Sequence, residues 1–216
     1  MITVSVNEQP NAGNNDSVTR CSTDSPVNLF NELGGSPDLG GSWTGPDGPA
    51  SSTFIPGTST PGVYTYSLSG AAPCVDDQAT LNVTINQAPD AGEDGDLTIC
   101  EDGPSVDLFT GLGGTYDLGG TWTDEDNTNQ LSGNIFDPFG LAPGTYSFEY
   151  TVPANGNCSA DDAHVDVTIV AALDAGSNSS PTVCGNNTQV NLFNLIGGNP
   201  QPGGTWLDLD LSLIHI

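Results

Sequence analysis

Apolar and polar residues alternate in short segments along this chain, which is typical of β-strands. Residues 2–6 read ITVSV, and the same alternation recurs as LNVTI at 81–85 and VDVTI at 165–169. The clearest strand segments are PGVYTYSL at 61–68 and PGTYSFEY at 143–150. No segment keeps a helical period, and 28 glycines and 16 prolines separate the apolar pieces. The pattern predicts an all-β protein with many turns.

The chain is a tandem array, because one block occurs three times without a gap. It reads VNLFNELGGSPDLGGSW at 27–43, VDLFTGLGGTYDLGGTW at 106–122 and VNLFNLIGGNPQPGGTW at 190–206. Complete repeats of about 80 residues are predicted at 10–88 and 89–172. Residues 1–9 match the last strand of a preceding repeat. Residues 173–216 match the start of a third, whose tail at 211–216 matches nothing else and resembles translated sequencing-adapter sequence.

Each repeat is predicted to be an antiparallel β-sandwich of immunoglobulin type, since roughly seven short strands are separated by turn signals. A solenoid is the alternative, but solenoid repeats are usually shorter. The Pro-Gly-x-Tyr sequences place Tyr64 and Tyr146 at a tyrosine corner, where the hydroxyl donates to upstream backbone. Trp43 and Trp122 are expected in the core against each repeat's cysteine pair, with sugar stacking by exposed indoles as the alternative.

The cysteines follow the repeat and predict disulfides. Cys21 is expected to pair with Cys74, and Cys100 with Cys158, while Cys184 belongs to the incomplete third copy. Buried free thiols are the alternative, and metal ligation is disfavoured because no C-x-x-C or Cys/His cluster occurs. Disulfides form in oxidising compartments, so the chain is predicted to be exported.

The charge balance is extreme, with 27 Asp and Glu against a single basic residue, Arg20. Binding to nucleic acid or to anionic membrane surfaces requires Lys or Arg, so both are excluded as partners. No apolar run is long enough for a membrane helix, and no direct membrane insertion is expected. The surface is either a strongly solvated one or one that binds divalent cations.

A calcium site at the junction between repeats is one such possibility, formed by Asp90, Asp94 and Asp96. The same loop resembles an EF-hand in spacing, but strand-like sequence follows it where an EF-hand has a helix. The acidic segment at 124–126 is a second candidate. Calcium is therefore the one cofactor that the sequence suggests.

Catalytic groups are sparse. His164 stands where the first repeat has Thr80 and is expected to be a surface strand residue, and His215 lies in the tail. The carboxylate pairs at 76–77 and 161–162 point to opposite faces of a strand, so they do not converge on a substrate. No nucleophile has a neighbouring base in the sequence. Glycosylation triplets begin at Asn82 and Asn186. The chain is predicted not to be an enzyme.

The V-[ND]-L-F…G-G-x-W block, the P-G-x-Y strand and the cysteine pairs resemble the immunoglobulin-like repeats of giant Bacteroidetes cell-surface adhesins, including those linked to gliding motility. The resemblance implies a secreted, cell-surface array exported by the type IX route, with neighbouring repeats and an unidentified surface ligand, such as a polysaccharide, as partners. The leading function is therefore a spacer or multivalent adhesin. The alternative is a carbohydrate-binding accessory domain of a secreted polysaccharide-degrading enzyme.

The third copy is expected to be the least stable part. Its Val190, Leu192, Phe193 and Trp206 lack the strands that cover their equivalents in the other repeats. Half a sandwich buries too little surface to offset the entropy of ordering its chain. Trp206 should therefore be far more exposed than Trp43 and Trp122.

Overall fold

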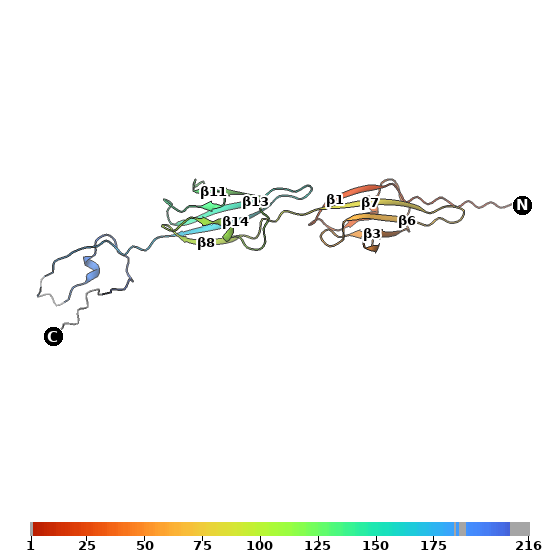
Figure 1. The fold of residues 1–216 in the computed structure, drawn as a ribbon. Coiled ribbons are helices and arrows are strands. Elements are labelled where there is room, and N and C mark those ends of the chain that lie inside the picture. The colour runs from red at the N-terminus through yellow and green to blue at the C-terminus, as the bar shows by residue number, and fades with distance from the viewer. Residues whose placement is uncertain (1, 184, 186–188, 208–216) are drawn as a thin grey trace.

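The computed structural model describes residues 2–183, 185 and 189–207. Two β-sandwiches follow one another along a line, and a smaller segment containing the third copy of the block follows the second (Figure 1). Cys184, the glycosylation triplet beginning at Asn186 and the 211–216 tail lie outside the described residues. Strands of each sandwich pair only with strands of the same sandwich, so each repeat is a separate folded unit.

The first repeat contains seven strands and one 3₁₀ turn. A five-stranded sheet has the order β1-β7-β6-β3-β4, and β2 pairs with β5 in a second, short sheet. Their bounds are β1 Asp16–Cys21, β2 Val27–Asn28, η1 Leu29–Glu32, β3 Ser42–Gly45, β4 Gly48–Ala50, β5 Thr53–Phe54, β6 Gly62–Leu68 and β7 Asp77–Asn86. The segment predicted at 61–68 is confirmed as β6.

The second repeat follows the same plan. One sheet has the order β10-β13-β14-β8 and the other the order β11-β12-β9. Their bounds are β8 Gly95–Cys100, β9 Val106–Asp107, η2 Leu108–Thr110, β10 Thr121–Asp124, β11 Leu131–Ser132, β12 Ile135–Phe136, β13 Gly144–Val152 and β14 Asp161–Val170. The segment predicted at 143–150 is confirmed as β13.

The pairing pattern decides the fold class. In both repeats the first strand runs parallel to the last one, β1 with β7 and β8 with β14, whereas the other pairs are antiparallel. The last strand lies between the first and the penultimate strand. The second strand belongs to the other sheet, where β2 pairs with β5 and β9 pairs with β12. Each repeat is an immunoglobulin-like sandwich. This order places the end of the first strand beside the end of the last strand, which later determines where the cysteines lie.

The V-[ND]-L-F part of the block forms a capped turn. Asn28 accepts a hydrogen bond from the backbone N–H of Phe30 at 3.1 Å, and Asp107 accepts one from Phe109 at 3.0 Å. These side chains cap the 3₁₀ turns η1 and η2, because Asn and Asp readily accept from an N–H two residues ahead. The following leucine, Leu29 or Leu108, is fully buried. The sequence Val-Asn/Asp-Leu-Phe is thus a cap followed by a core residue.

The predicted tyrosine corners are confirmed. Tyr64 donates from its hydroxyl to the carbonyl of Thr60 at 2.8 Å, and Tyr146 donates to Ala142 at 2.9 Å. Burial, with a smaller contribution from the charge of Asp47, raises the pKa of the Tyr64 hydroxyl. The hydroxyl therefore stays protonated and keeps its donor role. Each corner fixes the entry of the penultimate strand of its repeat, β6 or β13.

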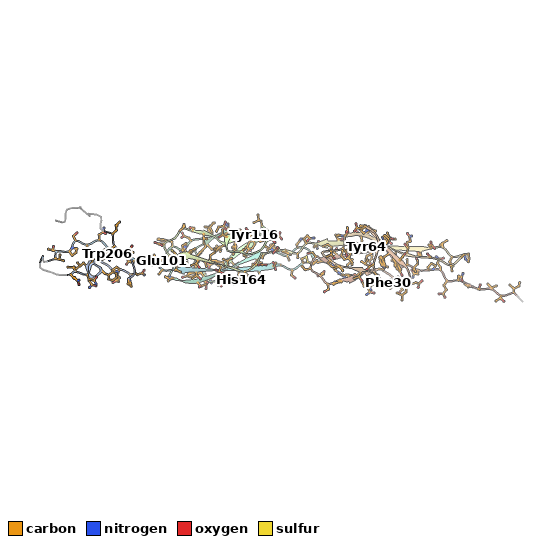
Figure 2. The ribbon with its side chains drawn as sticks, turned by 90° about the horizontal axis from the view of Figure 1, so that it is seen from below. Phe30, Tyr64, Glu101, Tyr116, His164 and Trp206 are labelled. Atoms are coloured by element: carbon orange, nitrogen blue, oxygen red, sulfur yellow. A yellow bond between two sulfur atoms is a disulfide. The ribbon has the colours of Figure 1, made fainter. Side chains whose placement is uncertain are left out.

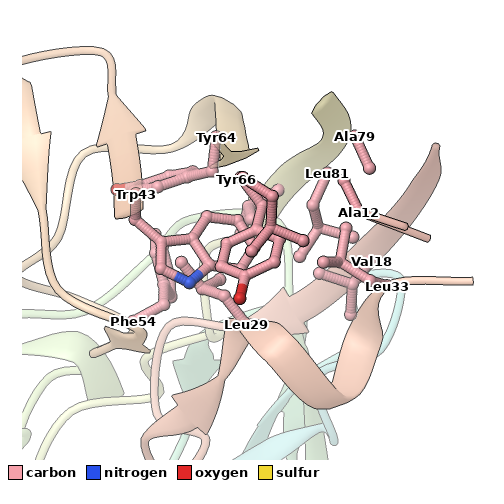
Figure 3. Packing of buried hydrophobic residues seen from close by; sticks show 12 residues of the cluster. Ala12, Val18, Leu29, Leu33, Trp43, Phe54, Tyr64, Tyr66, Ala79 and Leu81 are labelled. Carbon is pink, nitrogen blue, oxygen red and sulfur yellow. The ribbon is translucent and has the colours of Figure 1, made fainter. Parts of the chain in front are cut away.

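The tryptophan and the glycines of the block pack against one tyrosine. Trp43 is 7% exposed, so its predicted core position is confirmed, and its ring lies 5.1 Å from that of Tyr66 (Figure 3). The Tyr66 hydroxyl donates to the carbonyl of Asp38 and accepts from the N–H of Gly41, both at 2.8 Å. Gly40 has a φ of +101°, which favours glycine. The glycine pair therefore turns the chain and brings it onto the tyrosine.

The second repeat reproduces this arrangement with one difference. Tyr150 donates to Asp117 at 2.8 Å and accepts from Gly120 at 3.0 Å, and Trp122 packs 5.0 Å from its ring. Trp122 is half-buried, less covered than Trp43. Neither indole packs on a disulfide of its own repeat, which corrects that part of the prediction, because neither sandwich has a disulfide within it.

The two outer segments are less covered. Residues 2–9 form no strand, although a strand is predicted there, and Ile2, Val4 and Val6 are each at least 78% exposed. The equivalent strand β7 lies between β1 and β6, and residues 2–6 have no such partners. In the third copy, η3 (Leu192–Leu195) buries no residue and Trp206 is 58% exposed, as predicted (Figure 2).

Candidate functional site: the junction between the repeats

A disulfide crosses the junction between the two sandwiches. Cys21 of the first repeat is bonded to Cys158 of the second, with 5.1 Å between their Cα atoms and 137 residues between them in the sequence. Cys74 and Cys100 are free thiols. The predicted bridges Cys21–Cys74 and Cys100–Cys158 are therefore wrong, although a disulfide itself is present. The bridge joins neighbouring repeats and does not close a loop within either one.

Strand direction explains why the two cysteines of one repeat do not meet. Cys21 ends β1, which runs parallel to β7, so it lies beside Asn86 at the far end of β7. Cys74 lies three residues before β7 begins at Asp77. The ten residues of β7 span about 33 Å, and a disulfide requires Cα atoms within about 7 Å. The two cysteines therefore lie at opposite ends of the sandwich.

End-to-end stacking brings the correct pair together. The end of the first repeat that carries Cys21 faces the end of the second repeat that carries Cys158 (Figure 1). Cys158 lies three residues before β14, the same place that Cys74 has before β7. One cysteine at each end of a repeat is thus the arrangement needed for a bridge to the next repeat.

Hydrogen bonds from the loop at 155–158 reach the first repeat. Asn157 donates to the carbonyl of Thr19 at 2.8 Å, and Asn155 donates to Gln87 at 3.1 Å. The Sγ atom of Cys158 lies 3.4 Å from the carbonyl oxygen of Asn86. The connecting segment is fixed as well, because Ala88 donates to the hydroxyl of Ser22 at 3.0 Å.

Both cysteines of the bridge are 3% exposed. The glycine at 156 has a φ of +59°, and a Cβ there would overlap the Asn86 amide. The loop that carries Cys158 therefore lies flat on the first repeat, and the disulfide is shielded from solvent by both repeats. The junction is a small interface that is closed covalently.

The predicted calcium ligands are engaged elsewhere. Asp90 accepts from the N–H of Gly92 at 3.0 Å and from the hydroxyl of Thr115 at 2.9 Å. Asp94 accepts from the N–H of His164 at 2.8 Å, and Asp96 lies on β8 with an exposed side chain. Within the described part of the chain, no three His, Cys, Asp or Glu side chains gather where they could hold a metal ion. The structure does not bring Asp90, Asp94 and Asp96 together.

The second acidic candidate also forms a turn. Asp124 accepts from Thr128 at 2.8 Å and from the N–H of Asn129 at 3.1 Å, and Asp126 accepts from Ser147 at 2.8 Å. Acidic residues elsewhere do the same: Asp77 accepts from Ala12 at 2.7 Å. Many of the carboxylates thus hold loops by accepting backbone N–H groups.

His164 lies on β14 with a partly exposed ring, as predicted for a surface strand residue (Figure 2). Its Nδ1 atom is 3.8 Å from Asp94 and its Nε2 atom 3.7 Å from Glu125. Both neighbours are carboxylates, so the imidazole ring lies between two acidic side chains and beside no nucleophile. Among the described residues, no helix has the length and apolar character to cross a membrane.

A surface hollow of about 460 Å³ lies beside Trp122 in the second repeat. Its walls include Phe109, Leu118, Trp122, Asn134 and Tyr150. The hollow combines aromatic surface with one amide side chain.

No protein-family model matches this chain, and no curated protein matches it either. Among solved structures, it is similar to an I-band fragment of titin at 12% identity and a TM-score of 0.44, covering 75% of this chain and 65% of the fragment. It is also similar to the N-terminal four immunoglobulin domains of Dscam1, at 12% identity and a TM-score of 0.39, covering 79% and 48%.

A third solved structure, the immunoglobulin domains 1–5 of Sidekick-1, is similar at 13% identity and a TM-score of 0.33, covering 72% of this chain and 37% of that one. This chain therefore spans less than two thirds of the length of each of these structures.

Sequence reasoning missed the inter-repeat bridge and the hydrogen-bonding loop at 155–158. A signal was present, however. In an immunoglobulin-like sandwich with a parallel first strand, Cys21 at the end of that strand lies far from Cys74 before the last strand. Combining strand direction with cysteine position would have excluded a bridge within one repeat.

Proposed function

We propose that this chain is a non-enzymatic repeat module of a large secreted cell-surface protein, and that it serves as an extended spacer or multivalent adhesin. The observation that carries the proposal is the junction, where a buried disulfide and side-chain hydrogen bonds join two sandwiches end to end. A spacer must hold its length, and a covalent joint between repeats limits bending. Neighbouring repeats of the same chain are thus its first partners.

The surface chemistry supports an exposed extracellular setting. The formal net charge is −26, and the only basic Lys or Arg side chain, Arg20, pairs with Glu32 at 2.9 Å. Like charge along a rod keeps copies apart and soluble. The disulfide is consistent with an oxidising compartment. The resemblance of the repeated block to giant Bacteroidetes surface adhesins supports the same assignment.

Small-angle X-ray scattering of the oxidised chain tests the spacer proposal. β7 and β14 have ten residues each, about 33 Å per strand, so two sandwiches in line span at least about 66 Å. We expect a distance distribution typical of a narrow rod that extends beyond this length. Reduction should broaden the distribution because the joint can then bend. A compact particle with the repeats folded side by side would contradict the proposal.

A carbohydrate-binding module is the second candidate, and the hollow beside Trp122 is the observation that favours it. Aromatic walls bind sugar rings by stacking, and an amide supplies hydrogen bonds. Titration with soluble polysaccharides separates the candidates: saturable binding that is lost in Leu118→Asp would favour this second function. Leu39→Asp is the matched control, since Leu39 holds the equivalent position in the first repeat and is also exposed.

A further inference from the structure

The two free thiols lie at the same positions of the repeat as the two bridged cysteines: Cys100 matches Cys21, and Cys74 matches Cys158. Cys100 ends β8 and pairs in register with Val170, as Cys21 ends β1 and pairs with Asn86. The next backbone N–H is also bonded alike: Glu101 donates to Val170 at 3.0 Å, and Ser22 donates to Asn86 at 2.9 Å. Glu101, next to Cys100, lies at the end of the second repeat that faces the third copy (Figure 2).

The other thiol lies at the opposite end of the first repeat. The Sγ atom of Cys74 is 3.4 Å from the carbonyl oxygen of Asn7, and the Sγ atom of Cys158 is 3.4 Å from that of Asn86. Asn7 and Asn86 follow the same strand sequence of the repeat. Cys74 therefore contacts the segment before the first repeat at the position where Cys158 contacts the end of β7.

Further bonds tie the same loop to the residues before the first repeat. Asn7 donates to the carbonyl of Ala72 at 2.8 Å, and Gln9 donates to Val75 at 2.8 Å. At the central junction the direction is reversed, because Asn155 of the loop donates to the backbone carbonyl of Gln87 in the upstream segment. The loop around Cys74 thus contacts residues 7–9, and the loop around Cys158 contacts residues 86–87 at the equivalent place.

We propose that Cys74 and Cys100 are the open halves of further inter-repeat disulfides, formed with cysteines of adjoining repeats of this type in the same chain. The inference rests on the proposed function as a repeat module. Cys100 would bond to a cysteine placed like Cys158 in the following repeat. Cys74 would bond to one placed like Cys21 in the preceding repeat. Each repeat is then bonded to both neighbours, and the array becomes a covalent ladder.

The chemistry balances with a small disulfide oxidant. The thiolate of Cys100 attacks a sulfur of oxidised glutathione, which releases one reduced glutathione and leaves a mixed disulfide. The thiolate of the partner cysteine then attacks the Cys100 sulfur and releases the second reduced glutathione. Two thiols lose two protons and two electrons, and one glutathione disulfide becomes two thiols.

A variant of the full chain tests the ladder. A second copy of residues 89–172 is inserted after Ala172, with Cys100→Ser in the inserted copy so that only one Cys100 is present. After oxidation with glutathione, Glu-specific cleavage and mass spectrometry, we expect the peptide of residues 94–101 to be linked to the peptide that carries the inserted Cys158. In the unmodified chain, the Cys100 thiol of the same peptide should stay free and react with an alkylating reagent added before cleavage.

The matched control is the same variant with the inserted Cys158 changed to Ser, in which Cys100 should again be labelled. Three results would overturn the proposal: a Cys100 that stays labelled in the insertion variant, a bridge from Cys100 to the Cys158 of its own repeat, or oxidation only to dimers between chains. Failure of the ladder proposal can be told apart from failure of the spacer proposal, because peptide mapping tests the first and X-ray scattering tests the second.

Discussion

Pulled by its two ends, the oxidised chain should extend far less than the reduced chain. The bridge between Cys21 and Cys158 closes a loop over a sequence separation of 137 residues. Force applied at the ends passes through the disulfide and leaves the strands inside that loop unloaded. On reduction, we expect about 480 Å of additional contour length, since an extended residue spans about 3.5 Å. Optical-trap extension curves with and without a reducing agent measure the difference.

Two serine variants sharpen this experiment. Cys158→Ser under oxidising conditions should extend as the reduced chain does, because the loop is open. Cys74→Ser should behave as the parent chain, because Cys74 is a free thiol. Full extension of the oxidised parent chain, or the same short extension in Cys158→Ser, would show that the bridge does not carry the load.

The second large effect is expected from one methyl group in the repeated block. In Gly41→Ala, the new Cβ would lie 2.6 Å from the carbonyl oxygen of Ser67 and 2.5 Å from the Tyr66 ring. Both neighbours belong to β6 in the core, so the turn must move and the Gly41–Tyr66 hydrogen bond is lost. Overpacking of this kind costs about 1–3 kcal/mol, and the hydrogen bond adds about 1 kcal/mol.

The third copy supplies a matched control. Gly204 holds the same position in the block, and a Cβ there meets nothing within 4 Å. Gly204→Ala should therefore leave the free energy of unfolding of both sandwiches unchanged. Urea denaturation, followed by tryptophan fluorescence, compares the two variants. Equal stabilities for Gly41→Ala and Gly204→Ala would mean that the glycine pair is not required for packing against Tyr66.

Local features of the fold could be predicted because their causes are local. The P-G-x-Y sequence places Tyr64 four residues after Thr60, and that spacing alone specifies the corner hydrogen bond. Alternating apolar residues predicted β6 and β13, since one face of each strand enters the core. The core position of Trp43 was expected from the immunoglobulin-type sandwich. Its actual neighbour, Tyr66, is two residues after the corner tyrosine.

The junction could not be predicted from the repeat pattern alone. Two cysteines per repeat predict that bridges form, but not whether a bridge closes within a repeat or between repeats. The choice depends on where each cysteine lies along the sandwich axis, and Cys21 and Cys158 meet only because consecutive sandwiches stack end to end. The acidic residues were wrongly predicted to converge for a related reason. Asp90 and Asp94 are close in sequence, yet each accepts a hydrogen bond from a different backbone N–H.

Disulfide mapping of the oxidised chain tests the bridge between repeats most directly. The chain has one Arg and no Lys, so a Glu-specific protease is used after free thiols have been alkylated at low pH. We expect the peptide of residues 9–32, which contains Cys21, to be linked to the peptide of residues 150–216, which contains Cys158. The peptides with Cys74 and Cys100 should carry the label. A link between residues 9–32 and the Cys74 peptide at 33–93 would contradict the account.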